Sequence, residues 1–138
     1  MLRRLILALL FVPAAAHAAG GDIRLDRANI DSGDALSIQR GARVFVNYCL
    51  NCHAAAAMRY HGLMDLGLTE QQIKDNLLFT DGKVGDAMII AVAKKDQQEW
   101  FGVAPPDLSV IARSRGVDWL YTYMRSFYRD QSSGTGWN

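Results

Sequence analysis

Two cysteines and a histidine stand close together in the chain, in the order Cys49-Leu50-Asn51-Cys52-His53. In a helical segment the two thiols lie about one turn apart, so both can reach one large planar ligand. This spacing is typical of haem attachment, in which each thiol forms a thioether with one vinyl group of the porphyrin. A neutral nitrogen of His53 can then bind the iron. We therefore interpret the segment as the attachment site of one covalent haem c.

Three other interpretations of this segment compete with haem attachment: a thioredoxin-like dithiol, half of a zinc site, and a chance pattern. A redox dithiol is expected beside a βαβ pattern, which the sequence lacks. A structural zinc site needs four ligands, so the three residues of the motif would need a fourth from the few remaining histidines. The haem interpretation uses all three side chains of the motif and is favoured for that reason.

A haem that only transfers electrons usually has both axial positions filled, often by His and Met. The sixth ligand cannot be chosen from the sequence, because methionine is also a common packing residue and none of the candidates stands out by its spacing. The candidates are Met58, Met64, Met88, Met124 and, as an outsider, His61.

The N-terminus has the features of a bacterial export signal. Arg3 and Arg4 form a short positive region, Leu5 to Val12 is apolar, and Ala16-His17-Ala18 is a small-residue cleavage site. The apolar run is shorter than the roughly 20 residues that a membrane-spanning helix needs. We expect residues 1–18 to be a signal peptide and the mature protein to lie on the periplasmic side of the inner membrane.

The formal net charge is +1 and hydrophobic residues make up 50% of the chain, which fits one domain with an ordinary core and gives no indication of nucleic-acid binding. Residues 19–34 are polar, without periodic apolar positions, and are expected to form an extended N-terminal arm. The remaining residues, 35–138, are expected to form one cytochrome c domain.

Helical patterns dominate this domain. Apolar residues recur at helical spacing from Ala35 to Cys49, with Asp34 as a plausible cap. Within that helix, Gly41 would let a second helix cross closely beside Phe45. A capping box of Thr69 with Gln72 predicts a helix from residue 70 to about residue 78.

Further helices are predicted nearer the C-terminus. The pair Asp96 and Glu99 has the form of a second capping box, which would start a short helix reaching Trp100. Two helices are expected over residues 107–115 and 118–128, separated by Gly116. The short apolar run 88–93 is ambiguous between helix and strand, and no convincing alternating strands are found. The fold class is therefore mostly α.

Four blocks of sequence stand out besides the haem motif: Gln39-Arg40-Gly41-Ala42-Arg43-Val44-Phe45 before it, and Ala57-Met58-Arg59-Tyr60, Ala104-Pro105-Pro106-Asp107-Leu108-Ser109 and Arg113-Ser114-Arg115 after it. With these blocks in this order, the chain resembles cytochrome c1, the haem subunit of the bacterial ubiquinol–cytochrome c reductase (cytochrome bc1) complex, over nearly the whole of residues 22–138. The resemblance implies a class I cytochrome c-like helical domain.

The resemblance also implies a role for the chain and for several residues. The family takes single electrons from the Rieske iron-sulfur protein, passes them to cytochrome c, and is bound to cytochrome b in the membrane. Carried over by position, Cys49 and Cys52 attach the haem, His53 ligates the iron, and the prolines Pro105 and Pro106 border the haem. Arg115 would approach a propionate, a task that suits the guanidinium fork. By itself, an arginine at a helix end would as readily interact with the helix dipole; Trp100 and Trp119 are left out of the site as expected core residues.

One departure from the family lies at the end of the chain. In the family, the axial methionine and a C-terminal anchoring helix follow the segment matched by Thr135 to Asn138. The expectation is therefore a truncated chain, with iron that is five-coordinate or bound by a non-native ligand. A freestanding periplasmic cytochrome and a haem-based module that binds diatomic ligands are the alternatives. No substrate chemistry is expected on this chain itself.

Overall fold

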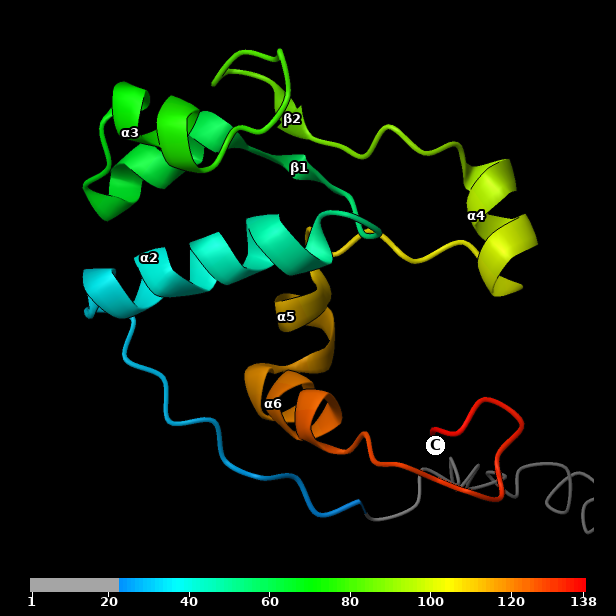
Figure 1. Ribbon diagram of the computed structural model, residues 1–138. Helices are drawn as coiled ribbons and strands as arrows, with labels where there is room; N and C mark the ends of the chain where they lie inside the picture. The colour runs from blue at the N-terminus through cyan, green and yellow to red at the C-terminus, as the bar shows by residue number, and fades with distance from the viewer. Residues whose placement is uncertain (1–22) are drawn as a thin grey trace, which may run out of the picture.

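A computed structural model describes residues 23–138, so the predicted signal peptide lies outside the described residues (Figure 1). The described chain is mostly helical and carries a small two-stranded sheet, as the resemblance to a class I cytochrome c implies. Its elements are α2 (Ala35–Val44), η1 (Phe45–Cys49), β1 (Ala55–Arg59), η2 (Tyr60–Leu66), α3 (Glu70–Asn76), β2 (Ala87–Met88), α4 (Lys94–Phe101), α5 (Ile111–Arg115) and α6 (Val117–Arg125). Within residues 23–138, none of the helices has the length and hydrophobicity needed to span a bilayer.

The first predicted helix is confirmed, and so is its cap. The Asp34 side chain accepts a hydrogen bond from the Ser37 amide at 2.9 Å, which satisfies one of the free donors of the first turn of α2. The helix widens in its last five residues to the π-helical turn η1, where the Leu50 amide bonds to the Phe45 carbonyl at 2.9 Å. Such turns are uncommon and often lie at functional sites. This one ends at Cys49.

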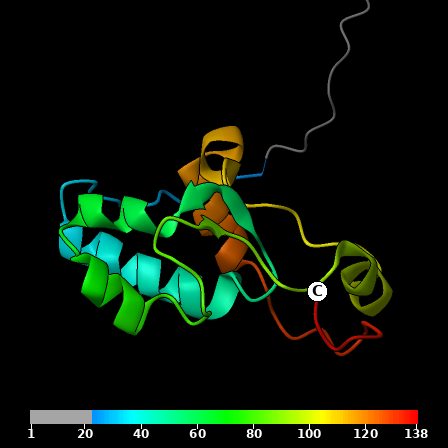
Figure 2. The ribbon, with the colours of Figure 1, turned by 90° about the horizontal axis from the view of Figure 1, so that it is seen from above.

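The hydrophobic core lies beside this helix and is completed by α3. Ile73 of α3 is fully buried, and Val46, Leu50, Leu77 and Met88 belong to the same buried cluster. The predicted capping box is present, because the Thr69 hydroxyl accepts from the Gln72 amide and the Gln72 side chain accepts from the Thr69 amide. α3 packs on η2, which in turn packs on α2 (Figures 1 and 2). The core therefore supports the helix that carries the first cysteine.

The structure contains two short strands where the sequence shows no convincing alternating pattern, and β2 ends at Met88, the first residue of the run that is ambiguous between helix and strand. β1 and β2 pair antiparallel, with Ala55 opposite Met88 and Arg59 opposite Ala87, and the register shifts between these two pairs. Three alanines and a methionine give β1 no alternation of apolar and polar residues. Such a strand is recognisable only from its partners.

Two of the later helices begin at other residues than predicted. α4 begins at Lys94 after Ala93, which makes no side-chain cap, so Asp96 lies in the first turn instead of capping the helix. α5 begins at Ile111 instead of Asp107, because the Asp107 carboxylate accepts the Ser109 amide at 2.8 Å in a local turn. Asp96 therefore lies inside a helix that begins earlier, and Asp107 lies in a turn before a helix that begins later.

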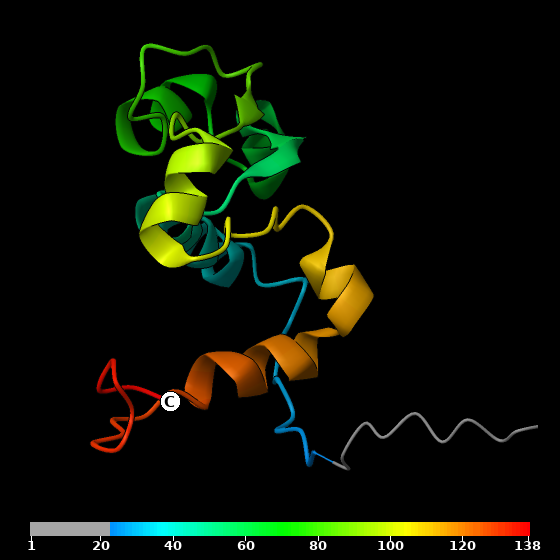
Figure 3. The ribbon, with the colours of Figure 1, turned by 90° about the vertical axis from the view of Figure 1, so that its right-hand side faces the viewer.

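Residues 23–31 form an extended arm that crosses α6, which Figure 3 shows below the rest of the domain. The Asp26 amide donates to the Thr122 hydroxyl, and the Ala28 amide donates to the Asp118 carboxylate, each at 2.8 Å. Arg125 adds an ion pair with Asp26 at 2.9 Å, which contributes little because both side chains are more than half exposed. Two side chains of α6 thus hold the arm by its backbone.

We predict that the double substitution Asp118→Ala and Thr122→Val releases the arm from α6. Each lost hydrogen bond removes about 0.5–1.5 kcal/mol of local stability, so exchange of the Asp26 and Ala28 amide protons should accelerate by about tenfold or more. Amide hydrogen exchange followed by NMR measures this. Asp65→Ala is the control, because Asp65 is an exposed acid whose carboxylate makes no hydrogen bond within residues 23–138. Unchanged exchange at both amides would show that the arm is held by other contacts.

Candidate functional site

The haem motif forms a tight turn directly after η1. Cys49 is the last residue of η1, and its carbonyl accepts the amides of Cys52 at 3.1 Å and His53 at 2.8 Å. Both cysteines are free thiols and both are half-buried. The turn therefore holds the two thiols and the imidazole within one short stretch of backbone, with neither thiol used in a disulfide.

The His53 ring is hydrogen-bonded through Nδ1 to the backbone carbonyl of Pro106. Nδ1 of His53 lies 2.8 Å from the Pro106 carbonyl oxygen. Because a carbonyl can only accept a hydrogen bond, Nδ1 must carry the proton, and the neutral ring then has its lone pair on Nε2. A ligating histidine commonly donates its second nitrogen in this way, which fixes both the tautomer and the ring orientation. Nε2 is thus available to a metal.

Asp107 follows Pro106, and its carboxylate is charged at neutral pH. The pKa of Asp107 is held below its ordinary value, first by the Ala56 amide and then by the hydroxyl and the amide of Ser109, all of which donate to the carboxylate. A lowered pKa means that the stabilisation from this carboxylate is present at neutral pH and is lost as the pH falls through the folded-state value.

A buried glutamine of α4 reaches the backbone of the motif. Gln97 of α4 is 3% exposed, and its Nε2 donates to the Cys52 carbonyl at 3.4 Å. α4 stands apart from the other helices in Figures 1 and 2. Its buried polar side chain is therefore a direct link between this helix and the cysteine turn.

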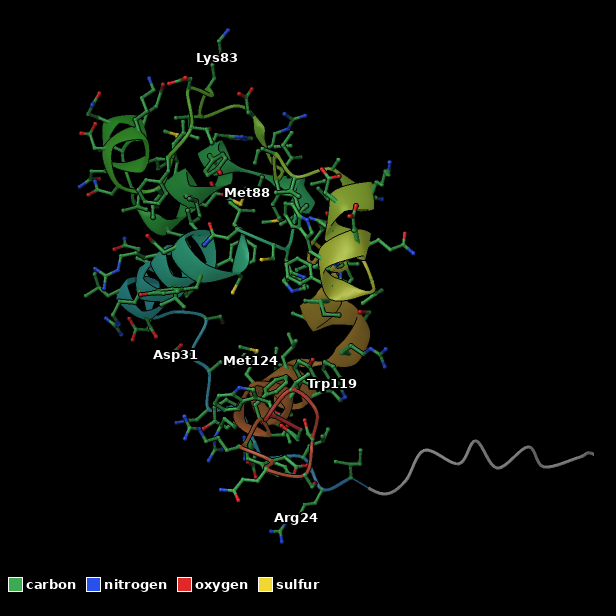
Figure 4. All side chains as sticks on the ribbon, turned by 45° about the vertical axis from the view of Figure 1, so that its right-hand side comes forward. Arg24, Asp31, Lys83, Met88, Trp119 and Met124 are labelled. Atoms are coloured by element: carbon green, nitrogen blue, oxygen red, sulfur yellow. The ribbon has the colours of Figure 1, made fainter. Side chains whose placement is uncertain are left out.

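Large apolar side chains are exposed on the elements next to the motif. Tyr48 of η1 is 76% exposed and Trp100 of α4 is 63% exposed, although such residues are usually buried. Met124 of α6 is 65% exposed and lies on the side of its helix turned toward α2 (Figure 4). A porphyrin is a large apolar surface that side chains of this kind could cover. Two free thiols, an imidazole with Nε2 free, and this apolar surface all fit a covalently bound haem.

A cavity of about 480 Å³ lies next to this site, with Ser109 among its lining residues. It lies between α2, β1 and η2 and is apolar, and Gly41, Phe45 and Met58 are among its lining residues. A Cβ added to Gly41 would meet nothing within 4 Å, so no second helix crosses there within residues 23–138. None of the three motif residues lines it.

The candidate sixth ligands are spread over several places. Met88 is 4% exposed and belongs to the hydrophobic core, and with Met58 it lines the cavity just described. Met64 and His61 line a shallow pocket with residues of α3 and of the loop 82–85. Met124 lies on α6 (Figure 4). The burial of Met88 indicates a packing role.

We predict that Met88→Leu leaves the haem spectrum unchanged. Leucine nearly conserves the volume of methionine, so the core stays packed, while any sulfur ligand to the iron is removed. The absorption spectrum of the oxidised protein, including the sulfur-to-iron charge-transfer region, measures the result. Loss of a charge-transfer band in Met88→Leu but not in Met58→Leu would instead identify Met88 as a ligand.

The other predicted site residues are placed as follows. Pro105 is half-buried beside Pro106. Arg115 is the last residue of α5, and its guanidinium carbon lies 5.2 Å from the centroid of the Trp119 ring. Arg115 makes no ion pair within the described part of the chain, so its charge remains free for an anionic partner. Trp100 and Trp119 are outside the buried core, contrary to the expectation from their size.

Three residues at the site were not identified from the sequence: Gln97, Asp107 and Ser109. The Asp-x-Ser spacing after two prolines is a recognisable turn signal, and it could have identified the local bond between Asp107 and Ser109. Gln97 has no such signal, because its partner, the Cys52 carbonyl, is 45 residues away in sequence.

Comparisons with known proteins give one matching family and several similar relatives. The cytochrome c1 family profile matches residues 27–136. The chain is 52% identical over 138 residues to a Nitrosomonas europaea protein named ammonia monooxygenase gamma subunit, with 100% of this chain and 59% of that protein covered. It is 49% identical over 140 residues to cytochrome c1 of Allochromatium vinosum, with 99% of this chain and 57% of that protein covered. Cytochrome c1 of Rhodospirillum rubrum is 28% identical over 116 residues, which cover 70% of this chain and 43% of that protein.

The chain thus spans about three fifths of the length of the two more similar relatives, 59% and 57%. The family match, by contrast, covers almost all the residues that the structure describes, including the haem motif and the segment from Pro105 to Arg115. The chain therefore belongs to the cytochrome c1 family.

Proposed function

We propose that this chain holds one covalent haem c and transfers single electrons from the Rieske iron-sulfur protein to cytochrome c, within a ubiquinol–cytochrome c reductase complex. Proteins of the cytochrome c1 family carry covalently bound haem c. The single observation that carries the assignment is the bond of 2.8 Å between His53 Nδ1 and the Pro106 carbonyl, beside two free thiols.

The bound haem would supply a one-electron couple, and the chain's own residues would attach and orient it. Cys49 and Cys52 are proposed as the two thioether residues and His53 as the iron ligand through Nε2. The Pro106 carbonyl accepts the hydrogen bond from Nδ1, which selects the tautomer of the neutral ring that has its lone pair on Nε2. Pro105 is proposed to border the haem.

Arg115 is proposed to pair with a haem propionate. Its guanidinium has no ion-pair partner within residues 23–138 and lies over the Trp119 ring. A guanidinium held in this way is well placed to pair with a carboxylate, because its rigid fork presents several donors in one plane. No residue of the chain is assigned bond-making chemistry on a substrate.

The proposed location is the periplasmic side of the bacterial inner membrane, in contact with cytochrome b. The apolar run and small-residue cleavage site of residues 1–18 support export. Export is also required for the partners named above to meet this chain. The membrane association is proposed to come from the complex.

The test is expression of the natural gene with c-type maturation machinery, followed by purification and electron-transfer kinetics. We expect cytochrome b and the Rieske protein to co-purify, and the haem to be reduced by the Rieske protein and reoxidised by cytochrome c. A haem protein that purifies alone and is not reduced by the Rieske protein would favour a freestanding cytochrome. Diatomic-ligand binding by the assembled complex would favour a sensor module.

A second candidate function follows from the relative that is 52% identical over the whole chain and is named ammonia monooxygenase gamma subunit. On that assignment the haem domain would accompany an oxygenase instead of the reductase. The same purification distinguishes the two, because the partners recovered with the chain would be oxygenase subunits instead of cytochrome b and the Rieske protein.

A further inference from the structure

Four hydrogen bonds join residues 53–57, at and after the end of the haem motif, to the segment 105–109, called the proline segment below. The Leu108 amide donates to the Ala54 carbonyl at 2.8 Å. The Ala56 amide donates to the Asp107 carboxylate at 2.8 Å, and the Ala57 amide donates to the Ser109 hydroxyl at 3.0 Å. Together with the bond from His53 to Pro106, these contacts join residues 53–57 to residues 106–109 at every step but one.

In two of these bonds the acceptor is a side chain, Asp107 or Ser109, where a regular strand pair would use a backbone carbonyl. Prolines 105 and 106 have no amide proton, so this stretch cannot form a regular ladder with a neighbouring strand. On the other edge β1 pairs with β2, with a register shift between Ala55 and Arg59. The shift coincides with two successive amides, Ala56 and Ala57, that both bond to the proline segment.

Asp107 is the centre of this arrangement. One carboxylate oxygen accepts the Ala56 amide and the other accepts the Ser109 amide at 2.8 Å. The carboxylate therefore shapes its own turn and at the same time ties that turn to β1. Pro106, whose carbonyl holds the His53 ring, is the residue immediately before it.

We propose that Asp107 and Ser109 are positioning residues for His53: they fix the Pro106 carbonyl against Nδ1 and so set the orientation of the imidazole. The proposal rests on the proposed role of His53 as haem ligand. Groups that orient a metal ligand are known to change metal affinity and the electronic character of the ligand without touching the metal. Removing them lets the Pro106 carbonyl move, and Nδ1 then shares its proton with water.

The test compares Asp107→Ala and Ser109→Ala with Asp130→Ala in the haem-loaded protein. Asp130 is a matched control, because its pKa is also lowered and its carboxylate also accepts the amide of a serine two residues later, Ser132, at 2.9 Å, although Asp130 is half-buried and Asp107 is exposed. Its hydrogen bonds, however, do not reach β1. Two measurements are made: NMR exchange of the His53 Nδ1 proton and of the Ala56 amide proton, and the reduction potential.

We expect Asp107→Ala to accelerate exchange of both protons by about tenfold, the change that one lost hydrogen bond of about 1.4 kcal/mol produces. The potential should move to more positive values, because a weaker bond at Nδ1 makes the imidazole a poorer donor to oxidised iron. Asp107→Asn keeps one acceptor oxygen and should lie between wild type and Asp107→Ala. Ser109→Ala should change the same quantities in the same direction, by less.

Wild-type exchange rates and potential in Asp107→Asn and Ser109→Ala would overturn the proposal, even if Asp107→Ala did not fold. An equal change in Asp130→Ala would do the same, because it would show a general effect of removing a turn carboxylate. Failure of the proposed function looks different: the wild-type protein itself would carry no haem. In that case accelerated exchange of the Ala56 amide in Asp107→Ala would still show that Asp107 ties the proline segment to β1. The proposal that Asp107 positions His53 as a haem ligand would be withdrawn.

Discussion

Replacement of both Cys49 and Cys52 by serine is expected to abolish covalent haem in the denatured protein. Haem c remains on a denatured chain only through its thioethers, and these two residues are the only cysteines in the sequence. Serine has nearly the same size as cysteine, and neither thiol is used in a disulfide. The fold should therefore survive the substitution while the attachment does not. Haem staining of a denaturing gel, after export and maturation in a bacterial host, measures the result.

Single substitutions and a neighbouring control make this result specific. Cys49→Ser and Cys52→Ser each leave one thioether, so both should give a band that stains, at lower yield. Asn51 lies between the cysteines, and its side chain donates only to the Asn47 carbonyl at 2.8 Å. Asn51→Ala should stain like wild type. An unstained wild-type band, with maturation working on another cytochrome, would contradict the haem assignment and favour the dithiol interpretation.

The elements that the sequence predicted well are encoded by neighbouring residues. The Asp34 cap and the capping box of Thr69 with Gln72 each join atoms three residues apart, so the pattern of side chains contains the whole interaction. The haem motif is of the same kind, because the turn from Cys49 to His53 closes on itself. Local signals of this sort can be interpreted without knowing the fold.

The elements that were missed depend on partners far away in sequence. β1 has no pattern of its own, and its bonds to Asp107 and Ser109 join residues 51 and 52 positions apart. Asp107 was interpreted as the start of a helix because its long-range role is invisible in the sequence. Asp96 shows the reverse error, since a correct local pattern for a cap falls inside a helix that begins earlier. Local propensity was overridden by tertiary contacts in both cases.

The functional roles divide in a similar way. The spacing alone indicated the two thiols and the iron ligand, whereas Pro105, Pro106 and Arg115 entered only through the resemblance to cytochrome c1. The structure adds a physical reason for Pro106, whose carbonyl fixes the tautomer of His53. For Arg115 it adds a free guanidinium over the Trp119 ring. The motif thus identifies the cofactor, and the contacts around it indicate how the ligand is oriented.

The largest expected effect on stability comes from Ile73→Ala. Ile73 is the one large side chain with no exposed surface among the described residues, and its cluster includes Val46 and Leu50, which flank Cys49 in the chain. Truncation of a buried isoleucine to alanine lowers the free energy of unfolding by about 2–5 kcal/mol, because hydrophobic burial is lost and a cavity remains. The whole free energy of unfolding of a small domain is only about 5–15 kcal/mol. Denaturant unfolding of the haem-loaded protein, followed by tryptophan fluorescence and by haem absorbance, measures the loss.

Two matched substitutions separate packing from simple loss of apolar surface. Ile73→Val removes one methylene from the same place and should cost about 0.5–1.5 kcal/mol. Ile89 is 65% exposed, so Ile89→Ala should change the free energy of unfolding by less than about 0.5 kcal/mol. Because the same cluster supports the helix that ends at Cys49, the fluorescence and haem signals should shift together to lower denaturant. Separate transitions in Ile73→Ala would instead show that the haem turn is stabilised independently of the core around α3, by the bonds from Pro106 and Asp107.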